Sequence, residues 1–462
     1  MGLIEMEMVD SLTGLLNRIA TLSEIDELLI EEGSEPVTLV LLDIGRFRKV
    51  NDSVGIQIGD RIIRIVSKRI KNAAPEAHVL GRTSGDNFAL AFKGLSQDQL
   101  DDITDKLLDF IKRPIAVGGN VIIVSLAIGI ATSQPADGKD AASLFHAADI
   151  ALHHAQRNKL EVTHFEPHML ELAQAAHSLE NDLRVSLATH TPELHQAINN
   201  EQFSIHYQPI ISSSNYAIAG FEALIRWNHP QRGWVSPGQF IPIAEEIGVI
   251  DMLGTWVMRK ACKDIMQWHG PQLAEDFFIS VNVSAKQFKK PALLADTINN
   301  ALEESRLAPH RLHLEMTETS TFNEIPEKFF AVKETGCKLS LDDFGTGYSS
   351  LTYLHSLPFD SVKLDKSFIS DLYVRDEARW SLSEKMIRAI FSLSSAIGLE
   401  LIVEGIETQP QLHFLHKLGC NPMYQGYLFS RPIPTDQIPD FLSTPLHLGD
   451  LHEQPNIQHC LL

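Results

Sequence analysis

The C-terminal part of the chain repeats one pattern, and this pattern constrains the fold more than any other feature. Each repeat is a short apolar run, typical of a buried strand, that ends at a polar residue and is followed by a helical stretch. Eight such runs within about 250 residues predict a TIM-like (β/α)8 barrel. The runs are Phe203–Gln208, Ile218–Trp227, Phe277–Ser284, Arg311–Glu318, Lys338–Asp343, Ser361–Asp365, Leu399–Gly405 and Tyr424–Phe429.

A polar side chain lies in or just after seven of these runs. In a (β/α)8 barrel the carboxyl ends of the strands meet at one mouth, so we expect these side chains to converge there. An isolated Glu or Asp beside a strand is usually only solvated, whereas the whole set describes a pocket of oxygen ligands with one ammonium group. The set is Glu222, Asn282, Glu315, Asp342 with Asp343, Lys363, Glu404 and Gln425.

The stretch Lys338–Leu351 holds two adjacent carboxylates, Asp342 and Asp343, at the end of an apolar run. One carboxylate can bridge two divalent cations while its neighbour completes the second site, which suits two-metal chemistry on a phosphate ester. For an isolated Asp-Asp pair the alternative is a βα turn that caps the next helix. The repetition along the chain favours a metal site.

The composition limits the number of domains and the kind of partner. The 462 residues are 44% hydrophobic and 21% charged, which predicts two or three globular domains. The formal net charge of −20 argues against a nucleic-acid polymer or an anionic membrane, because basic surfaces recruit both. A small phosphate substrate is compatible with this charge when metal ions neutralise it.

No stretch has the pattern of a targeting or membrane segment. The first residues are acidic, and the longest apolar run, Val121–Ala131, is shorter than the roughly 20 residues that a membrane helix needs. We expect this run to form a buried strand. The four cysteines lie far apart without a Cys-x-x-Cys pair, so we expect reduced, structural cysteines in a cytoplasmic protein without membrane insertion.

Residues 1–165 form a first unit, in which strand-like and helical segments alternate as in an α/β sandwich with a mainly antiparallel sheet. Five separated motifs resemble those of the diguanylate cyclase family named for its Gly-Gly-Asp-Glu-Phe (GGDEF) sequence. The resemblance implies a nucleotidyl-cyclase-like fold. The motifs are D-S-L-T-G-L-L-N-R (Asp10–Arg18), Leu42–Gly55, Gly59-Asp60, R-T-S-G-D-N-F-A (Arg82–Ala89) and A-D-I-A-L-H-H-A (Ala148–Ala155).

Several residues that cyclase chemistry needs are different in this chain. Ser84 and Asn87 replace a glycine and a glutamate of the name-giving motif, and Gly45 replaces an aspartate. Fewer carboxylates then remain for metal and proton handling, so we expect no cyclase activity. The remaining matches leave two interpretations open, an inactive scaffold and a regulatory domain that binds GTP. These matches are Asp43, Asn51, Asp60 and Asp86.

Residues 166–196 are predicted to form a helical linker. Leu172, Ala176, Leu179, Leu183 and Leu187 recur near helical spacing, which favours a semi-rigid helix over a flexible tether. A further helix can start at Pro192. Residues 446–462 are predicted to be a polar tail.

Residues 197–445 resemble, from end to end, the cyclic di-GMP phosphodiesterase family named for its Glu-Ala-Leu (EAL) motif. The resemblance implies hydrolysis of cyclic di-GMP to linear pGpG with two Mg2+ or Mn2+ ions. It places the first ion on Glu222, Asn282, Glu315 and Asp342, and the second on Asp342, Asp343 and Glu404. The motifs that carry it are Tyr207–Pro209, Phe221–Trp227, Ser280–Ser284, Leu314–Glu318, Leu341–Leu351, Val362–Asp365, Val403–Thr408 and Gln425–Pro432.

The same resemblance implies roles for other residues. Lys363 would orient the attacking water or take its proton. The residues implied to support catalysis beside it are Asp343, Glu404, Glu407 and Gln425. Those implied to hold the dinucleotide are Gln208, Leu224 and Arg226, the last through its forked guanidinium.

Two further interpretations concern regulation and class. Glu318 matches the anchor of a loop, Phe344–Leu351, that family members use at a homodimer interface, although a plain βα loop is the alternative. The alternative function is a silent cyclic di-GMP receptor that signals by shape, which should have lost metal ligands. A metal-dependent barrel that acts on another phosphate ester is a more distant alternative.

Overall fold

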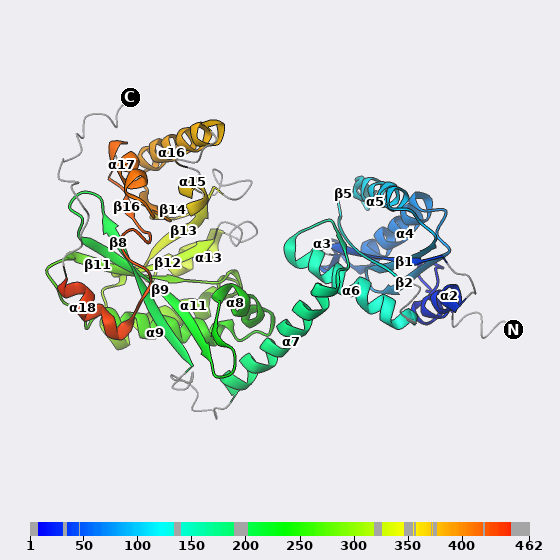
Figure 1. Ribbon diagram of the computed structural model, residues 1–462, viewed down its shortest axis with the longest axis horizontal. Coiled ribbons are helices and arrows are strands. Elements are labelled where there is room, and N and C mark those ends of the chain that lie inside the picture. The colour runs from blue at the N-terminus through cyan, green and yellow to red at the C-terminus, as the bar shows by residue number, and fades with distance from the viewer. Residues whose placement is uncertain are drawn as a thin grey trace. The chain divides into compact units, whose positions relative to one another are not determined.

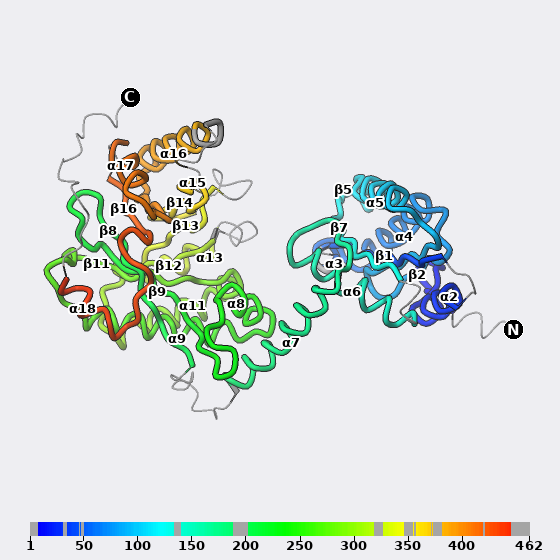
Figure 2. Tube along the Cα trace, in the orientation of Figure 1, coloured from blue at the N-terminus to red at the C-terminus, as the bar shows by residue number. Residues whose placement is uncertain are grey.

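The computed structural model describes residues 8–30, 35–45, 47–133, 140–188, 202–317, 326–345, 354, 357–370, 372, 377–418 and 421–444. The chain divides into two compact units, Met1–His177 and Ser178–Leu462. The boundary falls inside one helix, α7 (Pro167–Ala188) (Figures 1 and 2). Among the described residues, no helix is long and apolar enough to cross a membrane.

The first unit is a five-stranded sheet covered by helices on both faces. The strand order is β2-β3-β1-β6-β7, and only the β6–β7 pair is parallel. Alternate residues of the central strand β1 enter two hydrophobic clusters, one on each face. The strands are β1 (Val37–Gly45), β2 (Val79–Ser84), β3 (Asn87–Lys93), β6 (Ser125–Thr132) and β7 (Val162–His164). The predicted α/β sandwich is confirmed.

The helices divide between the two faces as the β1 alternation requires. Those over the face of Val40 and Leu42 are α3 (Phe47–Val54), α4 (Ile56–Ala73) and α5 (Gln97–Lys112). Those over the face of Leu39 and Leu41 are α2 (Arg18–Ile30) and α6 (Ala141–Asn158). Figure 1 shows α4 and α5 together, apart from α2 and α6.

The prediction of one buried strand over Val121–Ala131 is confirmed for β6, in which residues 126–131 are buried, and is wrong for the residues before it. This region contains a separate hairpin of β4 (Ile115–Val117) and β5 (Asn120–Ile122), and only β6 joins the main sheet. Val121 and Ile123 are 72% and 68% exposed, because the two-stranded hairpin has no layer packed over them.

The second unit is a closed barrel of eight strands, as predicted. Following the hydrogen bonds, the order is β9-β11-β12-β13-β14-β15-β16-β8, and β8 pairs back to β9. The strands are β8 (Phe203–Ser212), β9 (Ile218–His229), β11 (Leu273–Asn282), β12 (Leu312–Thr317), β13 (Lys338–Phe344), β14 (Ser361–Leu364), β15 (Glu400–Val403) and β16 (Met423–Tyr424). Short strands β10 (Gly233–Val235) and β17 (Ile433–Pro434) extend it.

Helices surround the barrel. They are α8 (Pro237–Glu246), α9 (Ile250–Ile265), α10 (Ala285–Phe288), α11 (Pro291–Ser305), α13 (Pro326–Lys333), α15 (Lys366–Ser370), α16 (Glu377–Ile397), α17 (Gln409–Lys417) and α18 (Ile438–Ser443).

Two details of the barrel differ from a regular repeat. Strand β8 is antiparallel to both neighbours, β9 and β16, so β8 and β9 are joined by a hairpin turn and not by a crossover helix. The predicted run Tyr424–Phe429 contributes only the first of its residues to β16, and Gln425 begins the turn that follows.

The two faces of each barrel strand have different surroundings. On β13, Leu339 and Leu341 point outward into the large core beneath the helices, so Ser340 and Asp342 point into the barrel. The lower interior holds a small apolar cluster, Ile210, Phe278 and Ile402.

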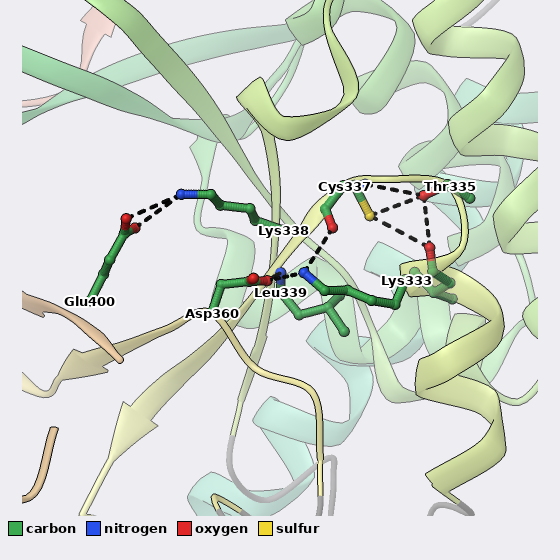
Figure 3. Close-up of polar contacts among 8 residues, drawn as sticks. Lys333, Thr335, Cys337, Lys338, Leu339, Asp360 and Glu400 are labelled. Carbon is green, nitrogen blue, oxygen red and sulfur yellow. Dashed lines mark hydrogen bonds and ion pairs between the residues drawn. The ribbon is translucent and has the colours of Figure 1, made fainter. Parts of the chain in front are cut away.

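The amino ends of the strands are tied together by polar contacts (Figure 3). Lys338 at the start of β13 pairs with Glu400 at the start of β15, at 3.1 Å. Asp360, just before β14, accepts hydrogen bonds from the Leu339 backbone N–H, at 2.7 Å, and from Lys333. These contacts stabilise the end of the barrel opposite the candidate site.

The second half of α7 packs on the barrel unit. Leu179, Leu183 and Leu187 enter one cluster with Phe203 and Trp227. Arg232, just before β10, donates to Asp182 at 2.9 Å and to Ser178 at 2.6 Å, which anchors the same stretch of helix. Residues 178–188 are therefore part of the barrel's packed structure, whereas Leu172, earlier on α7, is 56% exposed.

This packing predicts unequal effects of two matched leucine substitutions. We expect Leu183→Ala to lower the free energy of unfolding of the barrel unit by about 2–5 kcal/mol, because Leu183 is fully buried. Leu172→Ala on the same helix should change it by less than about 0.5 kcal/mol. Urea unfolding of both variants measures the difference, and equal effects would contradict the packing described.

Candidate active site

Seven polar residues of the mouth come from seven different strands. Glu222 lies in β9, Asn282 ends β11, Glu315 is in β12 and Asp342 in β13. Lys363 lies in β14, while Glu404 and Gln425 directly follow β15 and β16. Because these seven strands are parallel, their carboxyl ends meet at one mouth, and the structure brings the side chains together there.

The Lys363 ammonium lies at the centre of this group. Its Nζ is 2.5 Å from Glu404 Oε1, 2.9 Å from Glu315 Oε2, 3.3 Å from Glu222 Oε2 and 3.5 Å from Asp342 Oδ1. Only 1% of the Lys363 side chain is exposed. A buried ammonium with four carboxylate neighbours shows that this pocket is built to hold positive charge.

Amide side chains complete the surroundings of Glu222. Asn282 Nδ2 donates to Glu222 Oε1 and Gln425 Nε2 donates to Glu222 Oε2, both at 2.7 Å. Gln425 Nε2 also lies 3.2 Å from Gln208 Oε1, and Gln208 Nε2 donates to the Ser430 carbonyl at 3.2 Å. These bonds fix the Glu222 carboxylate and link it to β8.

The carboxyl groups of the site differ in proton affinity. Burial raises the pKa of Glu315 well above its usual value and that of Glu404 to about 8, although Lys363 opposes both shifts. Burial also raises the pKa of Asp342, again against Lys363. For Glu222, burial is outweighed by the Lys363 charge and by the bonds from Gln425 and Asn282, so its pKa is lowered. The pocket therefore holds more acidic groups than one ammonium neutralises.

Asp343 reaches the site through an irregular backbone. Successive side chains of a regular strand point to opposite faces, so Asp342 and Asp343 could not both face the mouth. The β13–β14 register shifts between Leu341 and Phe344, and Asp343 has a φ of 55°, in the left-handed region. Burial and the neighbouring Asp342 carboxylate raise the pKa of Asp343 to about 6.

The side chains at the mouth are of the types that bind divalent cations. Glu315 Oε1 is buried and has no hydrogen-bond partner among the described residues, so an acceptor is left over inside the pocket. Carboxylate and amide oxygens are the ligands that Mg2+ and Mn2+ prefer. With the ammonium among the carboxylates, no three acidic, His or Cys side chains in the described part of the chain stand in an arrangement that could hold a metal ion.

Other predicted residues lie at the rim or elsewhere. Leu224 and Arg226 continue β9 beyond Glu222, and Arg226 makes no ion pair within the described ranges. Glu407 is exposed; its backbone N–H donates to Gln411 Oε1 at 2.9 Å, and its carboxylate has no such bond with any described residue. Glu318 and most of Phe344–Leu351 lie outside the described residues. A groove of about 1380 Å3 between α9 and α11 contains none of the predicted site residues.

The first unit brings Asp43 and Asp86 together. Asp43 lies in β1 opposite Asn87 of β3, and burial and the Asp86 charge raise the pKa of Asp43. Asn87 Nδ2 donates to Ser84 Oγ at 3.1 Å, so the two replaced positions bond each other. A side chain at Gly45 would meet the Ser125 hydroxyl, since its Cβ would lie 2.3 Å from Ser125 Oγ.

The other two nucleotide-site matches are also neighbours. Asn51 on α3 packs against Gly59, the residue before Asp60 on α4, and Asn51 Oδ1 is buried without a partner among the described residues. Sequence reasoning missed Gln156, whose side chain hydrogen-bonds Asp43 from α6. Gln156 directly follows the A-D-I-A-L-H-H-A motif in the sequence, and this position could have indicated it.

The fold and the mouth define a barrel protein with an acidic, lysine-centred site, preceded by a cyclase-like unit. Residues 192–432 match the family model described as EAL domain, and residues 7–161 match that described as Diguanylate cyclase, GGDEF domain. The chain belongs to the EAL domain family and carries a GGDEF domain before the EAL domain.

Curated relatives align with this chain over almost its whole length. Cyclic di-GMP phosphodiesterase NbdA of Pseudomonas aeruginosa is 35% identical over 456 residues, which are 96% of this chain and 54% of the relative. From the same organism, Bifunctional diguanylate cyclase/cyclic di-GMP phosphodiesterase MucR is 34% identical over 442 residues, 94% of this chain and 62% of the relative. The chain thus spans only part of these relatives.

Solved structures share the fold. The EAL enzyme Bd1971, in a form bound to cAMP and cyclic-di-GMP, has a TM-score of 0.52 and 26% identity, with 70% of this chain and 82% of that chain covered. Vibrio cholerae LapD, an S helix-GGDEF-EAL structure bound to c-di-GMP, has a TM-score of 0.58 and 19% identity over 92% of this chain and 97% of that chain. The second likeness concerns the fold alone.

The raised pKa values predict how pH affects the metal-free protein. In the folded protein the pKa values of Asp343 and Glu404 are about 6 and 8, above the usual values of 3.8 and 4.5. Their stabilising contribution is therefore complete below about pH 4 and is lost as the pH rises through about 6 and 8. We expect Tm after chelation to fall over this window, and added Mg2+ to oppose the fall, because metal ligands must be deprotonated.

Thermal unfolding at a series of pH values, with EDTA or with Mg2+, measures this effect. Asp343→Asn should remove the part of the slope between about pH 4 and 6. A metal-free Tm that rises across the window, or a slope that neither Mg2+ nor this variant changes, would contradict the assignment.

Proposed function

We propose that the barrel hydrolyses cyclic di-GMP to linear pGpG. The observation that carries the proposal is the convergence of four carboxylates on Lys363 in a chain that belongs to the EAL domain family. The relatives NbdA and MucR are named as cyclic di-GMP phosphodiesterases, and a Bd1971 structure contains this dinucleotide. Cyclic di-GMP is therefore the substrate to test.

In this proposal, one divalent cation is held by Glu222, Asn282, Glu315 and Asp342, and a second by Asp342, Asp343 and Glu404. When bound, two such ions, Mg2+ or Mn2+, would offset the charge of the phosphodiester and acidify a nearby water. Asn282 and Gln425 hold the Glu222 carboxylate in place through their hydrogen bonds.

The other residues bind and orient the reactants. Lys363 keeps its proton, because Asp342, Glu222, Glu315 and Glu404 outweigh the effect of burial and raise its pKa well above the usual value. It therefore donates a hydrogen bond to the attacking water and orients it. Arg226 and Leu224 at the rim, with Gln208 opposite Glu222, bind the dinucleotide, and the Arg226 guanidinium can pair with a phosphate. Glu407 supports the site from its exposed position after β15.

One observation favours a second function. The Lys363 ammonium occupies the centre of the carboxylates, and the described side chains form no ready three-ligand metal cluster. In a receptor that binds cyclic di-GMP without hydrolysing it, the Lys363 ammonium would stay among the carboxylates and no metal ion would replace it. The two functions differ in turnover, so the product assay separates them.

Removing single metal ligands tests the hydrolysis. We expect Glu222→Ala and Asp343→Ala each to lower the rate of pGpG formation by about 10² or more, while Tm shows a folded barrel. Chromatography of cyclic di-GMP incubated with Mg2+ or Mn2+ measures the product. Glu384→Ala is the control, since this glutamate pairs with Arg388 on the outer side of α16.

Substantial activity in either folded variant would exclude the two-ion assignment. A wild-type protein that binds cyclic di-GMP but forms no pGpG with either ion would favour the receptor.

We further propose that the GGDEF domain makes no cyclic di-GMP and that GTP, if it binds, regulates the barrel. Asp43 and Asp86 would hold the metal and triphosphate, while Asn51 and Asp60 would read the guanine. The Ser84–Asn87 bond and the missing carboxylate at Gly45 support loss of the chemistry. Homodimerisation through the barrel remains part of this proposal.

This assignment predicts that GTP raises phosphodiesterase activity several-fold and is not consumed. Coupling between two sites is typically worth about 1–3 kcal/mol, which sets that scale. The measurement is pGpG formation against GTP concentration in the full chain, with cyclic di-GMP synthesis assayed in the Glu222→Ala background. Asp60→Ala should abolish the response, and Asp52→Ala, an exposed neighbour of Asn51, should preserve it.

A flat response to GTP would leave the GGDEF domain as a scaffold. New cyclic di-GMP in the Glu222→Ala background would show that the domain is an active cyclase.

A further inference from the structure

Four neighbouring strands carry a polar residue two positions before a residue of the mouth. The pairs are Ser280 and Asn282 on β11, His313 and Glu315 on β12, Ser340 and Asp342 on β13, and Ser361 and Lys363 on β14. Residues two apart on a strand point to the same face, so all four polar residues face the barrel interior, one layer below the site. We call Ser280, His313, Ser340 and Ser361 the polar layer.

The polar layer is buried and lacks partners. Ser280, Ser340 and Ser361 have no exposed surface, and His313 is 2% exposed. The three serine Oγ atoms and His313 Nδ1 have no hydrogen-bond partner among the described residues. Native proteins rarely leave buried polar atoms unpaired, so four such atoms in one layer indicate that they share a partner other than a protein side chain.

The opposite side of the barrel cannot supply that partner. On the other four strands the residues two positions below the mouth are Ile210, Gly220, Ile402 and Met423, which offer no polar side-chain atom. The register places Glu222 of β9 beside Ser280, but the Glu222 oxygens already accept hydrogen bonds from Asn282, Gln425 and Lys363. Below the layer, the Phe278 ring covers Gly220 and stacks on His313, with ring centroids 3.8 Å apart. Protein groups therefore close the layer from the side and from below.

Above the layer lies the unpaired oxygen of Glu315. Ser340 is in register with Glu315 on one side and with Ser361 on the other, so these three residues are direct neighbours across parallel strands. Glu315 Oε2 bonds Lys363, whereas Oε1 has no partner among the described residues. Serine is also much smaller than the branched residues that usually fill such a layer.

We propose that the polar layer is a binding site for ordered water molecules, which hydrogen-bond the serine hydroxyls and His313 Nδ1 and donate to Glu315 Oε1. A buried water typically makes about three hydrogen bonds, and this layer offers it polar atoms from adjacent strands. Through these waters, Ser340 and Ser361 act as positioning residues for the Glu315 carboxylate. That last role rests on Glu315 being a metal ligand, as proposed above, whereas the water site itself does not.

A crystal structure of the full chain, at a resolution that shows ordered water, tests the site directly. We expect density within hydrogen-bond distance of Ser340 Oγ, Ser361 Oγ and Glu315 Oε1, with and without Mg2+. An empty layer, or hydroxyls that bond only to backbone carbonyls, would overturn the proposal. This outcome does not depend on whether the protein hydrolyses cyclic di-GMP.

Thermal unfolding of Ser340→Ala distinguishes a hydrated layer from a dry one. If water is bound, the variant loses a hydrogen bond and Tm falls by about 2–4 °C. If the layer is dry, Ala removes an unsatisfied hydroxyl and Tm stays or rises, which contradicts the proposal. Ser394→Ala is the control, because Ser394 is a buried serine of α16 whose Oγ already donates to the Ile390 carbonyl at 2.9 Å.

The positioning role has a separate readout. We expect Ser340→Ala to weaken Mn2+ binding by about 10-fold to 100-fold in calorimetric titration, the range found when groups that orient metal ligands are removed. Ser394→Ala should bind Mn2+ as the wild type does. Unchanged affinity in Ser340→Ala would overturn the positioning role, and a wild type without Mn2+ affinity would overturn the proposed two-ion site instead.

Discussion

The buried ammonium of Lys363 is the interaction on which the mouth of the barrel depends. Four carboxylates lie within 3.5 Å of its Nζ, in a position almost without solvent. Without a cation between them, these carboxylates would repel one another, and removing one member of a buried charge pair typically costs about 3–5 kcal/mol. Burial, together with the neighbouring carboxylates, raises the pKa values of Glu315, Asp342 and Glu404, which leaves the pocket with affinity for further positive charge.

Much of this arrangement could be predicted from the sequence because a strand has a strict period of two. Once Glu315 and Lys363 are placed at strand ends, the barrel brings them together without further information. The position of Asp343 could not be predicted, since it depends on a shifted register and a left-handed φ that no residue type signals. The antiparallel β8 was predictable in principle, because the short segment between it and β9 cannot contain a crossover helix.

In the first unit, less could be predicted from the sequence than in the barrel. Substitutions at Ser84, Asn87 and Gly45 were visible as single departures, but their combined effect needed coordinates. Asn87 turns toward Ser84, and the Ser125 hydroxyl lies beside Gly45, where a Cβ would come within 2.3 Å of it. The exposed Val121 was misjudged because hydrophobicity alone does not show whether a strand joins a large sheet or a two-stranded hairpin. The glycines Gly118 and Gly119, both with positive φ, were the signal for that hairpin.

The polarity of the barrel interior changes from the base to the mouth. Ion pairs such as Lys338–Glu400 lie at the base, an apolar cluster around Phe278 lies above them, and the carboxylates surround Lys363 at the mouth. A ring of charges placed directly on the apolar cluster would lose solvation on its inner side, at a large cost. Polar residues at 280, 313, 340 and 361 separate the two on the strands that carry Asn282, Glu315, Asp342 and Lys363. A polar residue two positions before the site residue on these four strands therefore keeps the charged groups from lying directly on the apolar cluster.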